Sequence, residues 1–402
     1  KDSPIHPGPW ALMVCLGTAT LLVTGHPARS WTGRVLAMRV PRYLGRISYG
    51  TYLWHWPLIV FYQYIGGDLN DRSRAAFILA SFGLGALSHH LIETPMRRLP
   101  IQANRARLFR ILALQTAILA ALAGGLHWKA QSADPAEIAT FTRILQGGKM
   151  GNPDWGDCWY RPDILSPCTF GTGDSTARPL ILWGDSMANS ALPALDAFAT
   201  DAGRPGRLMA APSCAPLLNL SRDQSNSASC LQMNRETLAL LAESPAMDVV
   251  LFARWPYYAG GYSNDLSSPE GAHPFVDPDL NRLSGSTFDH FATALDGLLA
   301  AIPDRHRVIL IGPAPEMPGN VPLAMIKALR FGSTPDPVTR AMYENRSRRT
   351  IDILSQTAAR HGETFLDLTP DFCTDADCPQ SRDGVPIFAD HVHLSGLGND
   401  IL

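Results

Sequence analysis

The sequence predicts an α-helical membrane segment of four transmembrane helices, followed by an α/β domain with a mostly parallel sheet. Residues 9–128 are rich in Leu, Ala, Ile and Gly, whereas residues 129–402 have the composition of an ordinary soluble domain. From residue 179 onward, strand-like and helix-like segments alternate, which is typical of a parallel sheet with helices on both faces. A net charge of −2 gives no support for a nucleic-acid partner.

Four apolar stretches approach the roughly 20 residues that an α-helix needs to cross the hydrocarbon core of a bilayer. They are residues 9–25, 47–65, 75–92 and 108–128. Helices of a large soluble protein can also be apolar all round, but four in succession with basic connections favour a membrane. The second stretch is also aromatic and contains His55. His55 either has a functional role or is a polar side chain packed between helices, and the sequence favours neither interpretation.

The links between these stretches predict their orientation. Arginines crowd the links at residues 26–46 and 93–110, whereas the link at residues 66–74 is short and of mixed charge. Positive charge is enriched on the cytoplasmic side of membrane proteins, so the two arginine-rich links are expected there. The part of the chain after the fourth stretch is then expected outside the cytoplasm.

The cysteines indicate the same location. Cys15 stands alone in the first apolar stretch, and the other six fall as close pairs: Cys158 and Cys168, Cys214 and Cys230, Cys373 and Cys378. Close pairs in a polar domain predict disulfides and an oxidising compartment, with buried free thiols of a cytosolic enzyme as the alternative. No Cys-x-x-Cys or His-x-x-x-His spacing accompanies them, so no metal site is predicted.

The outer part divides into a connecting region and a candidate catalytic domain. Residues 129–178 hold a Gly-Gly pair, several prolines and two cysteines, and we expect a linker that merges into the irregular start of the domain at residues 179–402. Short apolar runs predict strands and longer segments predict helices. The expected strands are 179–183, 208–211, 248–253, 307–312 and 364–368, and the expected helices are 188–202, 231–242, 287–301 and 337–361. The chain starts without Met and stops abruptly, so we interpret it as a fragment of a longer protein.

Two short segments far apart in the chain carry the candidate chemistry. The first strand runs into a Gly-Asp-Ser turn that ends at Ser186, at the strand end where sites in parallel sheets lie. The second segment places Asp390 and His393 three residues apart. A serine hydroxyl is a weak nucleophile until a base takes its proton, and a carboxylate fixes the tautomer of that base. We therefore expect His393 to deprotonate Ser186 and Asp390 to orient His393. His391 is the competing base, disfavoured because neighbouring side chains diverge.

A serine enzyme also needs donors for the oxyanion that forms during acyl transfer. The backbone N–H of Ser186 is one candidate, because the turn opens a helix. Arg254 follows the strand at 248–253 and is the candidate second donor, with a surface salt bridge as the alternative. A Gly-Asp-Ser tripeptide alone is also compatible with a plain turn, and the later Asp-x-x-His is what favours a triad.

The turn and the Asp-x-x-His-Leu-Ser ending resemble the SGNH hydrolase family. The wider pattern resembles the SGNH domain fused behind integral-membrane acyltransferases of the acyltransferase-3 type. In the outer domain the matching segments are residues 182–186, 213–217, 253–255 and 315–318, and the pair of cysteines ahead of residues 390–395. In the membrane half they are residues 44–57 and 91–98, which resemble the last transmembrane helices of that acyltransferase family.

This resemblance implies an SGNH-like fold and a membrane-bound O-acyltransferase of the bacterial inner membrane. Such proteins move an acyl group, usually acetyl, from cytoplasmic acetyl-CoA across the membrane to a surface polysaccharide such as O-antigen. The periplasmic SGNH domain would complete the transfer with Ser186 as the acyl carrier. No bound cofactor is expected; acetyl-CoA would be the donor for the full-length protein, the polysaccharide the acceptor and membrane lipid the surroundings.

The sequence departs from that family pattern in three ways. Met187 stands where the fused group often has His. The Gly-x-Asn-Asp block of free SGNH hydrolases is matched only loosely by residues 261–265. The sequence therefore does not identify all the donors of the oxyanion hole. The early acyltransferase helices, with that family's best-marked catalytic His and Arg, lie outside this chain, so the fragment is not expected to use acetyl-CoA alone.

Two other functions remain open. A membrane-anchored carbohydrate esterase would use the same triad and let water accept the acyl group, since both activities share an acyl-serine intermediate. A non-catalytic glycan-binding module would leave the serine and the Asp-x-x-His incidental. The multi-span segment favours transfer, because an esterase needs only one anchor.

Overall fold

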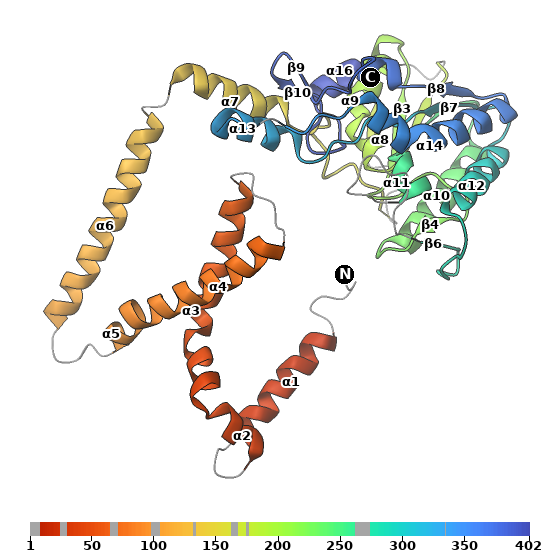
Figure 1. Cartoon of the computed structure of the whole chain (residues 1–402). Coiled ribbons are helices and arrows are strands. Elements are labelled where there is room, and N and C mark those ends of the chain that lie inside the picture. The colour runs from red at the N-terminus through yellow and green to blue at the C-terminus, as the bar shows by residue number, and fades with distance from the viewer. Residues whose placement is uncertain are drawn as a thin grey trace. The chain divides into compact units, whose positions relative to one another are not determined.

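The computed structural model describes residues 9–24, 30–64, 71–97, 105–131, 134–161, 168–173, 177–261, 274–333 and 335–402. The chain forms two compact units (Figure 1), which are described separately below. The first comprises Lys1–Pro135 with Phe331–Ser333, and the second comprises Ala136–Arg330 with Thr334–Leu402.

The described part of residues 1–131 is helical. Its helices are α1 (Pro9–Thr24), α2 (Trp31–Leu36), α3 (Arg39–Tyr64), α4 (Asp71–Ser88), the π-helix η1 (His89–Glu93), α5 (Thr94–Arg97) and α6 (Arg105–Gln131). Each of the four expected apolar stretches falls on a helix, although Gly25 and Ile65, at the ends of two of them, lie outside the described residues. Within the described ranges, one helix, Asp71–Arg97, is long and apolar enough to cross a membrane, and Ala11–Val23 and Leu112–Gly125 are apolar but shorter. The prediction of four transmembrane helices is therefore not confirmed.

Helices α3 and α4 cross closely because glycines lie at the contact. A Cβ on Gly50 would come within 3.1 Å of the Gly85 carbonyl oxygen, and one on Gly85 within 2.7 Å of the Thr51 nitrogen. Trp54 Nε1 donates to Ser88 Oγ across the pair at 2.9 Å. Small residues at the contact and a polar interhelical bond are the usual means by which helices associate in lipid.

The second unit is built around a six-stranded sheet. Its strand order is β1-β3-β2-β5-β7-β8. The strands are β1 (Thr169–Phe170), β2 (Leu180–Gly184), β3 (Gly206–Ala210), β5 (Asp248–Phe252), β7 (Arg307–Ile311) and β8 (Thr364–Leu366). Every neighbouring pair is parallel except β1 against β3. The predicted mostly parallel sheet is confirmed, and the short antiparallel edge strand makes it mixed.

Both faces of the sheet are buried, as the predicted helices on both sides require. Alternate side chains of β2 enter different core clusters: Ile181 and Trp183 join one, and Leu180 and Leu182 join the other. The helices of this unit are α7 (Pro135–Gly147), α8 (Ser186–Ser190), α9 (Leu192–Asp201), α10 (Ser227–Glu243), α11 (Trp255–Gly260), α12 (Thr287–Ala301), α13 (Val321–Phe331), α14 (Arg340–His361), α15 (Thr369–Phe372) and α16 (Gly396–Ile401). Two small sheets pair β4 (Ser221–Arg222) with β6 (Phe275–Val276), and β9 (Ser381–Arg382) with β10 (Val385–Pro386).

One expected helix is two helices in the structure. The segment expected at 188–202 begins at Ser186 as α8, breaks at Ala191 and continues as α9. Pro193 has no N–H to donate to the preceding turn, which favours a break there, and Pro is well tolerated in the first turn of the new helix α9.

The region at residues 129–178, expected as a linker that merges into the start of the outer domain, contains α7 and β1. The Pro and Gly residues that suggested a linker are the start and end of α7, at Pro135 and Gly147. Glu137 on α7 pairs with Arg330 on α13 at 2.7 Å, and the two helices lie side by side (Figure 1).

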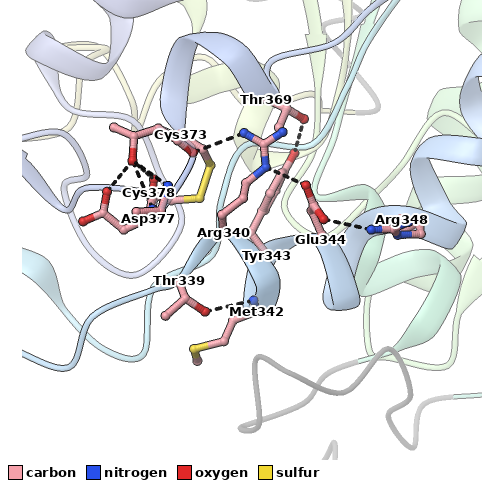
Figure 2. Close-up of polar contacts among 12 residues, drawn as sticks. Thr339, Arg340, Met342, Tyr343, Glu344, Arg348, Thr369, Cys373, Asp377 and Cys378 are labelled. Atoms are coloured by element: carbon pink, nitrogen blue, oxygen red, sulfur yellow. Dashed lines mark hydrogen bonds and ion pairs between the residues drawn. A yellow bond between two sulfur atoms is a disulfide. The ribbon is translucent and has the colours of Figure 1, made fainter.

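The three predicted disulfides are confirmed: Cys158–Cys168, Cys214–Cys230 and Cys373–Cys378. The third closes a short loop against the start of α14 (Figure 2). There Cys378 N donates to the Val338 carbonyl at 2.8 Å, and Thr339 caps the helix by accepting from Met342 N at 3.1 Å. This cap is why α14 begins at Arg340, later than the expected residue 337.

Candidate active site

The Gly-Asp-Ser turn is shaped by a glycine and capped by an aspartate. Ser186 is the first residue of α8, at the carboxyl end of the fully buried strand β2. A Cβ on Gly184 would lie 1.8 Å from the Phe252 carbonyl oxygen, so only glycine allows β2 to pass β5 this closely. Asp185 Oδ1 accepts from Met187 N at 2.8 Å and caps α8. The turn therefore presents the Ser186 hydroxyl at the edge of the sheet.

The structure brings the three predicted triad residues together. His393 Nε2 lies 2.8 Å from Ser186 Oγ, and His393 Nδ1 lies 2.6 Å from Asp390 Oδ2. Asp390 Oδ1 also accepts from the backbone nitrogens of Val392 and His393, at 2.8 and 3.0 Å, which forms the tight turn that aligns the two side chains. With Asp390 ionised, Nδ1 carries the proton and Nε2 is the acceptor for the serine hydroxyl.

The electrostatics of the Asp390 turn keep its carboxylate charged. Burial opposes ionisation, but the hydrogen bond and charge of His393 and two backbone N–H donors outweigh it, so the pKa of Asp390 lies well below its ordinary value. His391 lies 3.7 Å from Asp390 but has no described contact with Ser186. Burial, and next the charge of Arg254, lower the pKa of His391.

Asp185 supports the turn through hydrogen bonds to residues outside the triad. Its side chain is buried, and its Oδ2 accepts from Tyr258 Oη at 2.8 Å and from Arg254 N at 3.1 Å. Burial raises the pKa of Asp185 above its ordinary value, although these donors and Met187 N oppose that shift. The Asp of the Gly-Asp-Ser turn thus links β2 to the start of α11.

Arg254 forms an ion pair that is largely buried, whereas the alternative considered from the sequence was a surface salt bridge. Its Nε donates to Glu316 Oε1 at 2.6 Å, and its side chain is 15% exposed. Glu316 Oε2 accepts from Arg346 Nε at 3.0 Å, and Arg346 Nη2 donates to the Gly261 carbonyl at 2.7 Å. A single buried carboxylate therefore holds two arginines on either end of α11.

The loop that carries Glu316 also braces the Asp390 turn. Met317 N donates to the His391 carbonyl at 2.7 Å, and Val321 N donates to the Asp390 carbonyl at 3.1 Å. The Gly-Asp-Ser turn and the Asp390 turn are therefore connected through α11, Arg254 and Glu316. Sequence reasoning noted residues 315–318 only as a resemblance, because nothing local to Glu316 indicates its partners.

We expect Glu316→Gln to lower the free energy of unfolding by about 3–5 kcal/mol at neutral pH, because it removes the charge that compensates two buried arginines. Burial opposes ionisation, but Arg254 and Arg346 lower the pKa of Glu316 below its ordinary value. The stabilisation is therefore present above the unfolded pKa and is lost as pH falls below it. Melting curves of the detergent-solubilised chain at neutral and acidic pH measure this loss.

The matched control is Glu344→Gln. Glu344 also pairs with two arginines, Arg340 and Arg348, but on the surface of α14 (Figure 2). Exposed pairs contribute little to stability, so this variant should melt close to the wild type at every pH. Equal losses for the two variants would contradict the structural role of Glu316.

His55, the membrane-domain candidate, lies in the first unit. It lines a cavity of about 450 Å³ between α3 and α4 with Arg74 and Ser81. Its Nδ1 lies 2.5 Å from the Tyr52 carbonyl oxygen of its own helix.

Residues 262–265 of the loosely matched Gly-x-Asn-Asp block lie outside the described residues. Among the described residues, no group of three or more His, Cys, Asp or Glu is arranged to hold a metal.

Trp155 is a site neighbour that sequence reasoning missed. Its ring lies edge-to-face against His393, with centroids 5.0 Å apart, and against Trp159 at 4.9 Å. Asn189 Nδ2 on α8 donates to the Trp155 carbonyl at 3.3 Å. The residue fell in the expected linker, and the available signal was two tryptophans flanking a disulfide cysteine.

Relatives among known proteins match short parts of the chain. YrhL of Bacillus subtilis (strain 168) is 37% identical over 97 residues, which are 23% of this chain and 15% of that protein. The peptidoglycan O-acetyltransferase OatA of Listeria monocytogenes is 29% identical over 96 residues, also 23% and 15% of the two chains. The chain thus spans a small part of the length of these relatives. The periplasmic domain of a Salmonella ser. Paratyphi A lipopolysaccharide acetyltransferase aligns with a TM-score of 0.40 and 18% identity, over 56% of this chain and 80% of that one.

Two family patterns match the sequence in the predicted order. Residues 3–89 match the family described as an acyltransferase domain, the acyltransferase-3 type. Residues 154–402, well over half of the chain, match the family described as the SGNH domain fused to AT3 domains. The latter match begins before the predicted domain start at residue 179, in agreement with the disulfide at Cys158 and the strand β1. This protein therefore belongs to the family of SGNH domains fused to acyltransferase-3 domains.

Proposed function

We propose that this chain acts as a membrane-bound O-acyltransferase that places acetyl groups on hydroxyls of a bacterial surface polysaccharide such as O-antigen. The observation that carries the proposal is the triad, in which Ser186 Oγ lies 2.8 Å from His393 Nε2, in a domain of a family fused to acyltransferases. The named activity of the Listeria relative, a peptidoglycan O-acetyltransferase, supports acetyl transfer to a glycan.

The first half of the reaction forms an acyl-serine. His393 Nε2 takes the hydroxyl proton of Ser186, and Oγ attacks the carbonyl carbon of the acyl donor. Asp390 stabilises the imidazolium that results. When the tetrahedral intermediate collapses, His393 gives the proton to the leaving group, which departs as the ester bond to Ser186 forms.

The second half passes the acyl group on. His393 takes the proton of an acceptor sugar hydroxyl, whose oxygen attacks the acyl carbon. Collapse of the second intermediate breaks the bond to Ser186, and the proton returns from His393 to Oγ. The sugar leaves as an O-acetyl ester, and the serine is restored.

The oxyanion would be held by the Ser186 backbone N–H, with Arg254 as the second donor. Because Glu316 fixes the Arg254 guanidinium, a positive charge stands at a set position without reorganising during the reaction. The backbone N–H of Arg254 is already committed to Asp185, so the proposed donor is its side chain.

We place residues 1–128 in the bacterial inner membrane, with four spans, and the SGNH domain in the periplasm. The arginine-rich links and the three disulfides support this orientation. In this proposal residues 179–402 form the catalytic domain and residues 129–178 lead into it. The helix α7 and the strand β1 favour an earlier start of the folded unit. In the whole protein, cytoplasmic acetyl-CoA would be the acyl donor. His55 is a candidate for the membrane part of the path, and membrane lipid surrounds these helices.

Transfer is distinguished from hydrolysis by letting a sugar and water compete for the acyl group in one reaction. The full chain in lipid nanodiscs would receive p-nitrophenyl acetate and a neutral oligosaccharide, with acetylated sugar measured by mass spectrometry and free acetate by an enzymatic assay. We expect acetylated sugar well above the level without protein. Acetate alone would instead assign the chain as a carbohydrate esterase, and neither product would assign a glycan-binding module.

A further inference from the structure

We propose that Trp155 forms the wall of an acceptor subsite, on which a pyranose ring of the glycan stacks beside His393. This inference rests on the proposed function, because it names the surface that would hold the sugar during the second half of the reaction. It is carried by the position of the indole, by its exposure and by the rigidity of its loop.

The position of the acceptor follows from the chemistry. Its hydroxyl must reach His393 Nε2 and the acyl carbon on Ser186 at the same time, so its sugar ring must lie within a few atoms of the imidazole. The Trp155 ring contacts that same imidazole, at 5.0 Å between centroids and an interplanar angle of 74°. A sugar that enters with its hydroxyl toward Nε2 therefore meets this indole.

Core packing does not account for Trp155. Trp183 and Trp255 are 0% exposed and belong to a buried core cluster, as their size favours. Trp155 is half-buried, and it belongs to neither core cluster found among the described residues. A large aromatic side chain kept partly in solvent beside convergent polar groups is typical of a ligand site.

The loop that holds Trp155 is fixed at several points. Asn152 Nδ2 donates to Asn189 Oδ1 at 2.5 Å, and Asn189 Nδ2 holds the Trp155 carbonyl. Downstream, Cys158 is bonded to Cys168, and Tyr160 N donates to the Ala210 carbonyl at 2.8 Å. Because Asn189 belongs to the helix that Ser186 begins, the indole keeps its place relative to the nucleophile. A preformed platform loses little conformational entropy when a ligand binds.

The ligand class follows from the chemistry of the indole face. The π-system is negative on its face, and the C–H hydrogens on one side of a pyranose ring carry partial positive charge. Stacking therefore holds the ring by its C–H face and leaves the hydroxyls at the ring edge for His393. An uncharged pyranoside within an oligosaccharide fits this arrangement.

The test measures binding without chemistry. The full chain carrying Ser186→Ala, in lipid nanodiscs, is titrated with chitotetraose and with maltotetraose, and saturation-transfer NMR reports which sugar protons lie against aromatic side chains. We expect saturation of ring C–H protons by at least one probe. Adding Trp155→Ala or Trp155→Leu should raise Kd about tenfold and remove that saturation, whereas Trp155→Phe should keep most of both.

The matched control is Phe198→Ala, which removes an exposed aromatic side chain on α9 that has no described contact with the triad. It should leave Kd unchanged. An unchanged Kd in both the Ala and Leu variants of Trp155 overturns the inference, and so does a parent protein that binds neither probe. A chain that binds sugar through Trp155 but yields no acetylated sugar would refute the proposed function and retain the subsite.

Discussion

Replacement of Ser186 by alanine is expected to abolish acetylation of the surface polysaccharide while the protein remains in the membrane. The variant has no oxygen to carry the acyl group, and His393 loses the hydroxyl 2.8 Å from its Nε2. Loss of a serine nucleophile in a triad lowers turnover by about 10⁶-fold. The acetyl content of polysaccharide isolated from cells that depend on this protein measures the effect.

The control for this variant is Ser355→Ala on α14, whose hydroxyl makes a local hydrogen bond to the Asp352 carbonyl among the described residues. It should leave acetylation at the wild-type level. Retained acetylation in the Ser186→Ala strain would exclude an acyl-serine and with it the reaction proposed above. Detection of the protein in isolated membranes keeps loss of folding apart from loss of chemistry.

Asp390→Asn is expected to lower turnover of p-nitrophenyl acetate by about 10⁴-fold. The new amide would donate to His393 Nδ1, so the imidazole proton would move to Nε2, where it blocks acceptance of the Ser186 proton. The fold should persist, because the remaining Oδ1 can still accept from the two backbone nitrogens of the turn. Initial rates of the purified chain measure the loss, and melting curves check the fold.

The pH dependence of wild-type activity is not expected to follow the protonation of Asp390. Because the pKa of Asp390 lies well below its ordinary value, Asp390 should stay ionised throughout the mildly acidic range. A fall in wild-type activity there would then report protonation of a group other than Asp390.

The control for Asp390→Asn is Asp375→Asn, which changes an exposed aspartate in the same part of the chain. Activity of Asp390→Asn within tenfold of the wild type would contradict the orienting role.

Much of the site could be predicted because its parts are local. Three residues separate Asp390 from His393, so one tight turn aligns the two side chains, and an apolar strand that ends in Gly-Asp-Ser fixes where Ser186 lies. The rule that sites lie outside the carboxyl ends of parallel strands supplied the rest. The same local reasoning found the strands β2 and β5, which are buried on both faces, and β7, whose apolar run is mostly buried.

Less could be predicted where a local signal had two interpretations. Proline and glycine around residues 135–148 suggested a linker, yet they start and end α7, which pairs with α13 through Glu137 and Arg330. The apolar stretches of residues 9–128 are helical, but Asp71–Arg97 alone among the described helices is long and apolar enough to span a bilayer. Composition indicates the environment of a segment more surely than its exact length.

The sequence by itself determined the class of domain and the three disulfides, and it predicted the three residues that the fold brings together at the candidate site. Each of these depends on short spacings or on apolar patterning. Tertiary structure alone decided which groups support that triad. Glu316 pairs with Arg254 and Arg346, and Trp155 contacts His393, only when loops distant in the chain converge at one edge of the sheet. Such pairings depend on the path of the folded backbone, because the burial and the contacts of these side chains come from residues that are distant in the sequence.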